Sequence, residues 1–288
     1  MMWLLFSLLN AFFESVANAL SKRGAIKIDV LSAAWAQRFF SLFIILPLAL
    51  ITRSFQSVNQ TFWIAIIATS LLNTLTTILF IRTIKSSPLS LTLPIVTLTP
   101  VFLLITSPLM LGEFPKPIGL VGILSTVIGA YILNLSKRTH GLFEPFLSIW
   151  KEPGPRLMLL IAFIWSITSN ILKIGVKNSN PILAAFVEEC IILSLLTIIV
   201  LFKKISLKRV AQNGFVLAPI GIASGLAIIF QVIAFSMAIV PNVMTIKRTS
   251  TLFGTLWGKI FFKEKNIKER LAGAAVMLSG VVLIAISS

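Results

Sequence analysis

The chain has 288 residues, of which 57% are hydrophobic and only 12% are charged. Soluble globular proteins carry about 25% charged residues, so this composition excludes a soluble globule and indicates an integral membrane protein. The formal net charge of +16 does not indicate nucleic-acid binding, because the Lys and Arg residues are spread over short connections and do not form one patch with aromatic side chains.

Apolar stretches long enough to cross a hydrocarbon core of about 30 Å recur along the whole chain. Ten are predicted, at residues 2–20, 31–51, 61–81, 87–111, 117–136, 155–175, 182–202, 213–238, 241–261 and 270–286. The longest connection, 137–154, is expected to be a linker, and its segment HGLFEPFLSIWKEPG (140–154) is amphipathic enough to lie on the membrane surface. No soluble catalytic domain fits between the spans, so we expect the function to lie within the membrane.

The connections predict how the chain is oriented. The first span lacks a basic leading segment and an obvious cleavage site, and we interpret it as a retained helix. Seventeen Lys and Arg residues fall in the odd-numbered connections, which the positive-inside rule places in the cytoplasm with both termini outside. The even-numbered connections hold four such residues: Arg53, Lys116, Lys173 and Lys177.

The two halves of the chain resemble each other at one offset. LGEFPKPIGLVGILSTVIGAYIL (111–133) aligns with FKEKNIKERLAGAAVMLSGVVLI (262–284), and DVLSAAWAQRFF (29–40) aligns with NPILAAFVEECI (180–191), both at an offset of 151 residues. The first alignment superposes Glu113 on Glu264, Gly122 on Gly273 and Gly129 on Gly280. We expect the glycines to allow close helix packing. The glutamates are expected to lie at helix ends and to pair with neighbouring basic residues, Glu113 with Lys116 and Glu264 with Lys265 or Lys268.

The duplication predicts an all-α membrane protein of ten transmembrane helices in two five-helix repeats. The first repeat is expected at 1–136, the linker at 137–154 and the second repeat at 155–288. Because five is odd, the second repeat must be inserted upside down, which is the inverted-repeat plan of many secondary transporters. In that plan the solute site lies near the midplane.

Charged residues in the middle of spans are the candidate site. Lys247 and Arg248 lie side by side within 241–261, where each charge costs about 2.5–3.5 kcal/mol. Arg38, Glu14, Glu188 and Glu189 are predicted at a similar depth, and the six charges sum to zero. We expect a network around a cavity, with Arg38 and Glu188–Glu189 on opposite walls; the alternative is a set of ion pairs that latches the repeats together.

Two further features of this network are expected from helix geometry. Adjacent residues on a helix point about 100° apart, so one member of the Lys247–Arg248 pair is expected to face the solute while the other makes a structural contact. Acids and bases that exchange partners between two states could also carry protons. Polar stripes at helical spacing add Asn18 and Asn170 as secondary site residues. These two residues align when FESVANALSK (13–22) is placed over WSITSNILKI (165–174).

The residues also carry a resemblance to a known family. Ten spans in two repeats, with Leu-Gly-Glu (111–113) and Phe-Lys-Glu (262–264) turns each followed by a glycine-bearing apolar helix, resemble the drug/metabolite transporter superfamily and its EamA-type permeases. TIKRTSTLFGTLWGKIFFKEK (245–265) is similar to the ninth helix of the triose-phosphate translocator branch. That second resemblance implies that Lys247 and Arg248 bind an anionic group.

These observations predict a secondary transporter of a small polar or anionic metabolite, driven by protons or by exchange. One alternative is an exporter of amino acids or other zwitterions, in which the amine meets Glu188 or Glu189. A non-transporting scaffold or an intramembrane enzyme is the third, and the six charges argue against a scaffold. No cofactor, catalytic residue or metal site is expected; the partners are the solute and membrane lipid, and the expected location is a prokaryotic plasma membrane.

Overall fold

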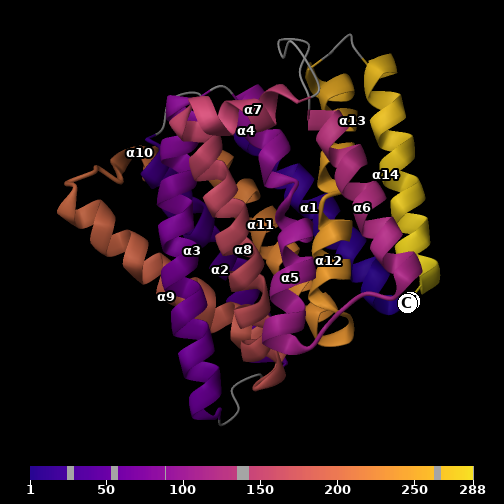
Figure 1. Cartoon of the computed structure of the whole chain (residues 1–288). Coiled ribbons are helices and arrows are strands. Elements are labelled where there is room, and N and C mark those ends of the chain that lie inside the picture. Colours follow the sequence, from indigo (N-terminus) through magenta and orange to yellow (C-terminus); the bar gives the residue numbers. More distant parts are fainter. Residues whose placement is uncertain (25–28, 53–57, 88, 135–142, 263–266, 288) are drawn as a thin grey trace. The chain divides into compact units, whose positions relative to one another are not determined.

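The computed structural model describes residues 1–24, 29–52, 58–87, 89–134, 143–262 and 267–287 (Figure 1). Every regular element within these ranges is an α-helix. The helices are α1 (Met2–Gly24), α2 (Val30–Ile51), α3 (Gln60–Ser86), α4 (Leu89–Val96), α5 (Thr99–Leu111), α6 (Pro117–Asn134), α7 (Glu144–Lys151), α8 (Pro153–Lys177), α9 (Pro181–Phe202), α10 (Lys208–Gln212), α11 (Gly214–Met237), α12 (Val240–Lys247), α13 (Ser250–Phe262) and α14 (Ile267–Ser287).

Seven helical segments of the described chain are long and apolar enough to cross a membrane. They cover α1, α2, α3, α8, α9 and α11, together with the combined segment Leu91–Leu111 from α4 and α5. The apolar parts of α6 and α14 are shorter. The predicted span at 241–261 is not one continuous helix, because α12 ends at Lys247 and α13 begins at Ser250.

The helix bounds repeat along the chain at the offset found in the sequence. Adding 151 to the first and last residue numbers of α2, α4 and α5 gives those of α9, α12 and α13. The caps follow the same rule. Asp29 accepts hydrogen bonds from backbone N–H groups at the start of α2, and Asn180 accepts one at the start of α9. Each capping side chain satisfies donors that the first helical turn leaves without partners.

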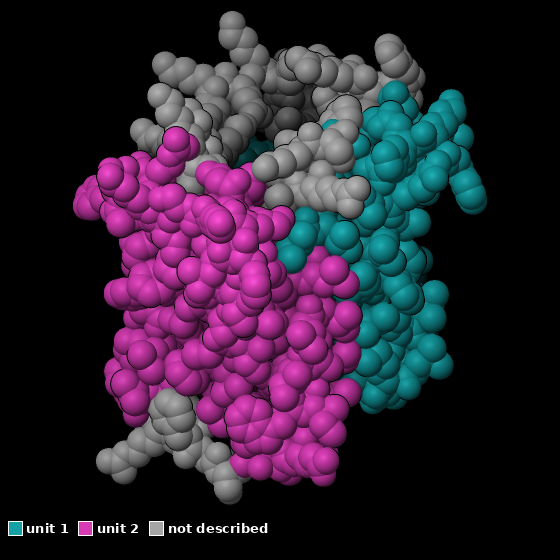
Figure 2. Space-filling view, turned by 90° about the vertical axis from the view of Figure 1, so that its left-hand side faces the viewer, with its two compact units in different colours: residues 1, 78–170, 238–288 teal, residues 2–77, 171–237 magenta. Residues whose placement is uncertain are grey.

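The described chain forms two compact units, which divide it differently from the two halves of the sequence (Figure 2). Unit 1 contains residues 1, 78–170 and 238–288, and unit 2 contains residues 2–77 and 171–237. Each unit therefore takes helices from both halves. The division into repeats 1–136 and 155–288 remains a prediction from the sequence.

In unit 2, α11 packs against α1, α2 and α9. Two small residues allow α11 to approach α2: a Cβ built on Gly221 would lie 2.9 Å from Gln37 O, and one on Gly225 would lie 2.8 Å from Ser41 O. Gln37 Nε2 also donates a hydrogen bond of 2.7 Å to Ser224 Oγ on α11. Close backbone approach and hydrogen bonds across the helices replace the hydrophobic effect, which is absent between helices in lipid.

In unit 1, α6 and α14 run side by side (Figure 1). A Cβ on Gly122 would lie 2.7 Å from Gly280 O, and one on Gly129 would lie 2.6 Å from Gly273 O. The expected packing role of these glycines is confirmed. The lower-numbered glycine of one helix meets the higher-numbered glycine of the other, so the two helices are antiparallel.

The linker contains a short helix, α7, whose polar and apolar residues segregate to different sides. Ser148 is 5% exposed, and Ile149 packs against the cluster of Ile95, Met158 and Ile161. Leu147 and Trp150 are 58% and 83% exposed. The amphipathic character predicted for 140–154 is therefore present in its described part.

Candidate functional site

Arg38 and Glu189 form an ion pair within unit 2, between α2 and α9. The side chain of Glu189 is 1% exposed and that of Arg38 is 25% exposed. Ser41, one turn after Arg38, donates a hydrogen bond of 2.9 Å from Oγ to Glu189 Oε2. Both carboxylate oxygens of Glu189 are thus bound by side chains of α2, which is the condition under which a charge is tolerated in an apolar interior.

Glu188, the next residue toward the start of α9, is bound by a different helix. Its Oε1 accepts a hydrogen bond of 2.8 Å from Asn73 Nδ2 and one of 3.3 Å from Thr69 Oγ1, both on α3. Glu188 is 4% exposed. Glu189 and Glu188 therefore point to α2 and α3, as the rotation of about 100° between adjacent helical residues requires. The hydrogen-bond donors to Glu188 are neutral, whereas Glu189 is bound to a cation.

The remaining candidates of unit 2 differ in exposure. Glu14 on α1 is half-buried, and Asn18, one turn later, is exposed. The sequence analysis counted Lys173 among the loop charges, but it lies inside α8 and is only 4% exposed. Its burial could have been predicted, because Lys173 follows Ser166 and Asn170 at helical spacing. A buried ammonium needs polar surroundings, so Lys173 is a further candidate for this site.

Lys247 and Arg248 lie at the break between α12 and α13, in unit 1. Lys247 is the last residue of α12 and Arg248 is its C-cap. Arg248 N donates to Thr245 O at 3.0 Å and Thr249 N donates to Ile246 O at 2.9 Å. Hydrogen bonds to the residue three positions back tighten the turn into the 3₁₀ form. Both charged side chains are half-buried at this tightened turn.

The same break occurs 151 residues earlier, between α4 and α5. Thr97 N donates to Pro94 O at 3.3 Å and Leu98 N donates to Ile95 O at 3.0 Å. Pro94 and Pro100 flank this break, and because proline has no backbone N–H group it removes a helical hydrogen bond. Prolines therefore account for the break in the first half.

Threonines replace those prolines in the second half. Thr245 and Thr251 occupy the positions equivalent to Pro94 and Pro100. Thr245 Oγ1 donates to Pro241 O at 2.6 Å, and Thr251 Oγ1 donates to Arg248 O at 2.6 Å. Hydroxyl groups that bind backbone carbonyls in this way bend helices. Threonine hydroxyls bind backbone carbonyls at the first break too, from Thr97 Oγ1 to Pro94 O and from Thr99 Oγ1 to Val96 O, so the two breaks differ in their prolines and not in this contact. Only the second carries charged side chains, since Val96 and Thr97 stand where Lys247 and Arg248 do.

Asn170 is fully buried in unit 1 and joins α8 to α5. Its Nδ2 donates to Thr106 Oγ1 at 3.0 Å and to Ser166 O at 3.0 Å, while its Oδ1 accepts from Ser107 Oγ at 2.7 Å. The offset of 151 places Asn18 opposite Ser169, one residue before Asn170. Ser169 is also buried, at 6% exposed, so Asn18 differs in exposure from both residues with which it can be aligned.

Glu113 stabilises the other end of α12. Gly112, with φ of 67°, ends α5 in the left-handed conformation that glycine adopts most readily. The chain then turns, and Glu113 Oε2 accepts a hydrogen bond of 3.0 Å from Val240 N at the start of α12. A carboxylate there also interacts favourably with the helix dipole. Glu113 lies at a helix end as expected, but the partner that the structure shows is a backbone amide and not the expected Lys116. Glu264 lies outside the described residues.

The structure therefore brings some of the predicted site residues together within each unit. Unit 2 holds Glu14, Asn18, Arg38, Glu188 and Glu189, and unit 1 holds Lys247, Arg248 and Asn170. Arg38 and Glu189, expected on opposite walls of a cavity, are in direct contact. Ser41, Thr69 and Asn73 were not predicted as site residues, although Asn73 belongs to a polar stripe of its span. Across the described part of the chain, no group of three or more His, Cys, Asp or Glu residues could hold a metal ion.

Comparisons with known proteins agree with this fold. An uncharacterized transporter of Archaeoglobus fulgidus is 25% identical over a 290-residue alignment that covers 99% of this chain and 98% of the relative. A second uncharacterized transporter of that organism is 29% identical over 130 residues, 44% of each chain. A protein of known crystal structure, 14% identical, superposes with a TM-score of 0.79 over 99% of this chain and 96% of its own.

The sequence profile of the EamA-like transporter family matches the chain twice, at residues 1–135 and at residues 153–286. The two matches cover nearly the whole chain and fall on its two halves. With seven segments that can cross a membrane, the protein is an integral multi-pass membrane protein. The chain belongs to the EamA-like transporter family.

Proposed function

We propose that this protein is a secondary transporter that moves a small polar or anionic metabolite across the membrane by alternating access. The observation that carries the proposal is the pair of equivalent helix breaks, between α4 and α5 and between α12 and α13. Discontinuous helices in corresponding positions of two repeats are how many secondary transporters build a solute site near the midplane. Protons or a second solute drive the movement.

The fold that accompanies this function is ten membrane helices in two inverted repeats, 1–136 and 155–288. The equal helix bounds at an offset of 151 residues support two copies of one unit of structure. The antiparallel packing of α6 against its equivalent, α14, supports inversion, because equivalent helices of an upright duplication would run in the same direction. Both termini lie outside, and the archaeal relatives support a prokaryotic plasma membrane.

Lys247 or Arg248 binds the anionic group of the solute. A cation at a helix break is near backbone groups that a continuous helix would use internally, and its charge attracts an anion in a medium of low dielectric constant. The resemblance of 245–265 to the triose-phosphate translocator branch supports an anionic group as the part of the solute that is bound. Arg38, Glu14 and Asn18 in unit 2 and Asn170 in unit 1 are further candidate solute-binding residues.

A zwitterion such as an amino acid is the second candidate, and one observation favours it. Glu188 is buried beside the neutral donors Asn73 and Thr69, whereas Glu189 is already paired with Arg38. Glu188 is therefore the carboxylate that would bind an ammonium group.

Counterflow into proteoliposomes tests both candidates. Vesicles loaded with a phosphorylated metabolite pool or an amino-acid pool are expected to accumulate the corresponding labelled solute with wild-type protein. Lys247→Ala or Arg248→Ala should abolish this uptake and the thermal stabilisation by the solute, while Lys116→Ala, at an exposed lysine outside the helices, should keep both. If vesicles loaded with either pool accumulate no labelled solute, the transport assignment is wrong. If Lys247→Ala and Arg248→Ala are still stabilised by the solute as wild type is, the site assignment is wrong.

A further inference from the structure

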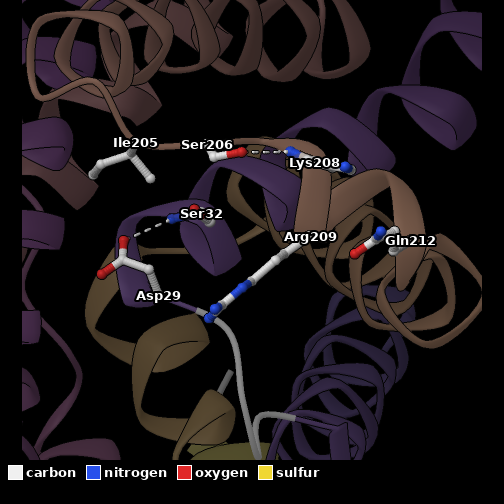
Figure 3. A pocket seen from close by; sticks show the side chains of 7 residues that line it. All are labelled: Asp29, Ser32, Ile205, Ser206, Lys208, Arg209 and Gln212. Carbon is white, nitrogen blue, oxygen red and sulfur yellow. Dashed lines mark hydrogen bonds between the residues drawn. The ribbon is translucent and has the colours of Figure 1, made fainter.

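A pocket of about 510 Å³ lies in unit 2 at one end of three membrane helices (Figure 3). It is lined by residues before and at the start of α2 and by the connection from α9 to α11. This pocket is separate in sequence and composition from the buried charges described above. Its lining is mostly polar or charged: Asp29, Ser32, Ser206, Lys208, Arg209 and Gln212.

The pocket has a fixed frame because the short helix α10 is anchored. Val210 is 5% exposed and packs with Ala36 on α2 and with Leu217 on α11. Asp29 Oδ2 accepts hydrogen bonds of 3.0 and 3.3 Å from Leu31 N and Ser32 N, so this carboxylate is bound to the start of α2. The backbone around the pocket is thus held by packing and by capping.

The charge of this region is strongly positive. Lys203, Lys204, Lys208 and Arg209 are all exposed and lie within seven residues of one another, against one acidic residue in the pocket, Asp29. Figure 3 shows Arg209 extended from α10 toward the side of the pocket where Asp29 and Ser32 lie. Two cations, two hydroxyl groups and an amide are donors suited to the oxygen atoms of a phosphate ester.

Exposed aromatic residues stand on both sides of the basic connection. Phe202, the last residue of α9, is 85% exposed, and Phe215, near the start of α11, is 95% exposed. Aromatic residues beside Lys and Arg at the ends of membrane helices mark the interfacial layer, where phospholipid headgroups lie. A phosphate ester that reaches this pocket from the bilayer can therefore keep its acyl chains in lipid.

We propose that this pocket binds the phosphate ester of an anionic phospholipid headgroup, with Lys208 and Arg209 as its cations and Ser32, Ser206 and Gln212 as neutral donors. The bound lipid bridges α2, α9 and α11 at their ends. The site does not depend on which solute the protein carries.

The test uses the full-length protein in detergent, with thermal unfolding and native mass spectrometry as readouts. The probes are dioleoylphosphatidylglycerol, dioleoylphosphatidylcholine, and glycerol 3-phosphate as the soluble form of the same ester. The pocket variant is Lys208→Gln with Arg209→Gln. The control variant, Lys203→Gln with Lys204→Gln, removes the same charge from the same connection without changing the pocket lining.

Phosphatidylglycerol is expected to stabilise the wild type more than phosphatidylcholine, and its apparent affinity should fall about tenfold or more in the pocket variant but less than about twofold in the control. If glycerol 3-phosphate stabilises the protein as much as phosphatidylglycerol does, and the pocket variant loses this effect, the pocket binds a soluble phosphate ester and the lipid is not its ligand. An equal loss in both variants would show diffuse attraction to charge and overturn the pocket, as would the absence of any preference for phosphatidylglycerol.

Discussion

Arg38 and Glu189 stand at equivalent positions of the two halves, 151 residues apart, and form an ion pair with each other. The two halves therefore carry opposite charges at one pair of aligned positions, and these two side chains meet. Identical charged residues there would have repelled each other in a medium of low dielectric constant.

The first prediction concerns this pair. Arg38→Ala leaves the carboxylate of Glu189 buried without its cation and is expected to destabilise the protein by about 3–5 kcal/mol. Replacing both residues, with Arg38→Met and Glu189→Leu, removes both charges and should be closer to wild type, because no charge is left buried alone. Thermal unfolding in detergent measures the difference. A double variant no more stable than Arg38→Ala would contradict this explanation.

The second prediction concerns the neutral partner of Glu188. Asn73→Leu removes the donor 2.8 Å from Glu188 Oε1 and should cost about 1–3 kcal/mol, the desolvation penalty of a buried acceptor that loses a hydrogen bond. Thr77→Val is the control, because the Thr77 hydroxyl binds only the backbone O of Asn73 among the hydrogen bonds described here. If both variants unfold at the same temperature, the bond to Glu188 does not stabilise the fold.

The third prediction compares two glycines. A Cβ on Gly129 would lie 2.5 Å from Met277 N and 2.6 Å from Gly273 O, both backbone atoms. Gly129→Ala should therefore force α6 and α14 apart and lower the unfolding temperature. A Cβ on Gly254 meets no atom within 4 Å, and Gly254→Ala should stabilise α13 by about 0.5–1 kcal/mol through helix propensity. Equal effects of the two substitutions would contradict the close packing.

Helix positions were largely predictable from the sequence, because long apolar stretches in lipid have few alternatives to the α-helix. The break at Lys247 was not predicted. Threonine hydroxyls bind backbone carbonyls there, at Thr245, Thr249 and Thr251, but such bonds also occur inside the continuous helix α3, so threonines in the sequence do not predict a break. Pro94 and Pro100 indicate the equivalent break in the first half, and the alignment of the two halves would have predicted a break at Lys247 from them.

The sequence indicated candidate site residues but not the contacts that they make. A charged residue in a membrane span is conspicuous in any sequence, whereas its partner depends on how the helix is rotated. An error of one residue changes the direction of a side chain by about 100°. Lys173 shows a different difficulty, because it lies near enough to a helix end to be read as a loop residue and is nevertheless buried.

The last prediction concerns the contact that fixes α12. Glu113→Ala removes the acceptor of Val240 N, 3.0 Å away, and the favourable charge at the start of the helix, and should cost about 0.5–2 kcal/mol. Glu113→Gln keeps an acceptor oxygen without the charge and should fall between wild type and Glu113→Ala. Hydrogen exchange of the α12 amides should accelerate in the same order, while exchange in α9, which lies in unit 2, should not change. Because α12 ends at Lys247, a looser start would also weaken solute binding at that residue; unchanged exchange in α12 of Glu113→Ala would show that the helix is held by its other contacts instead.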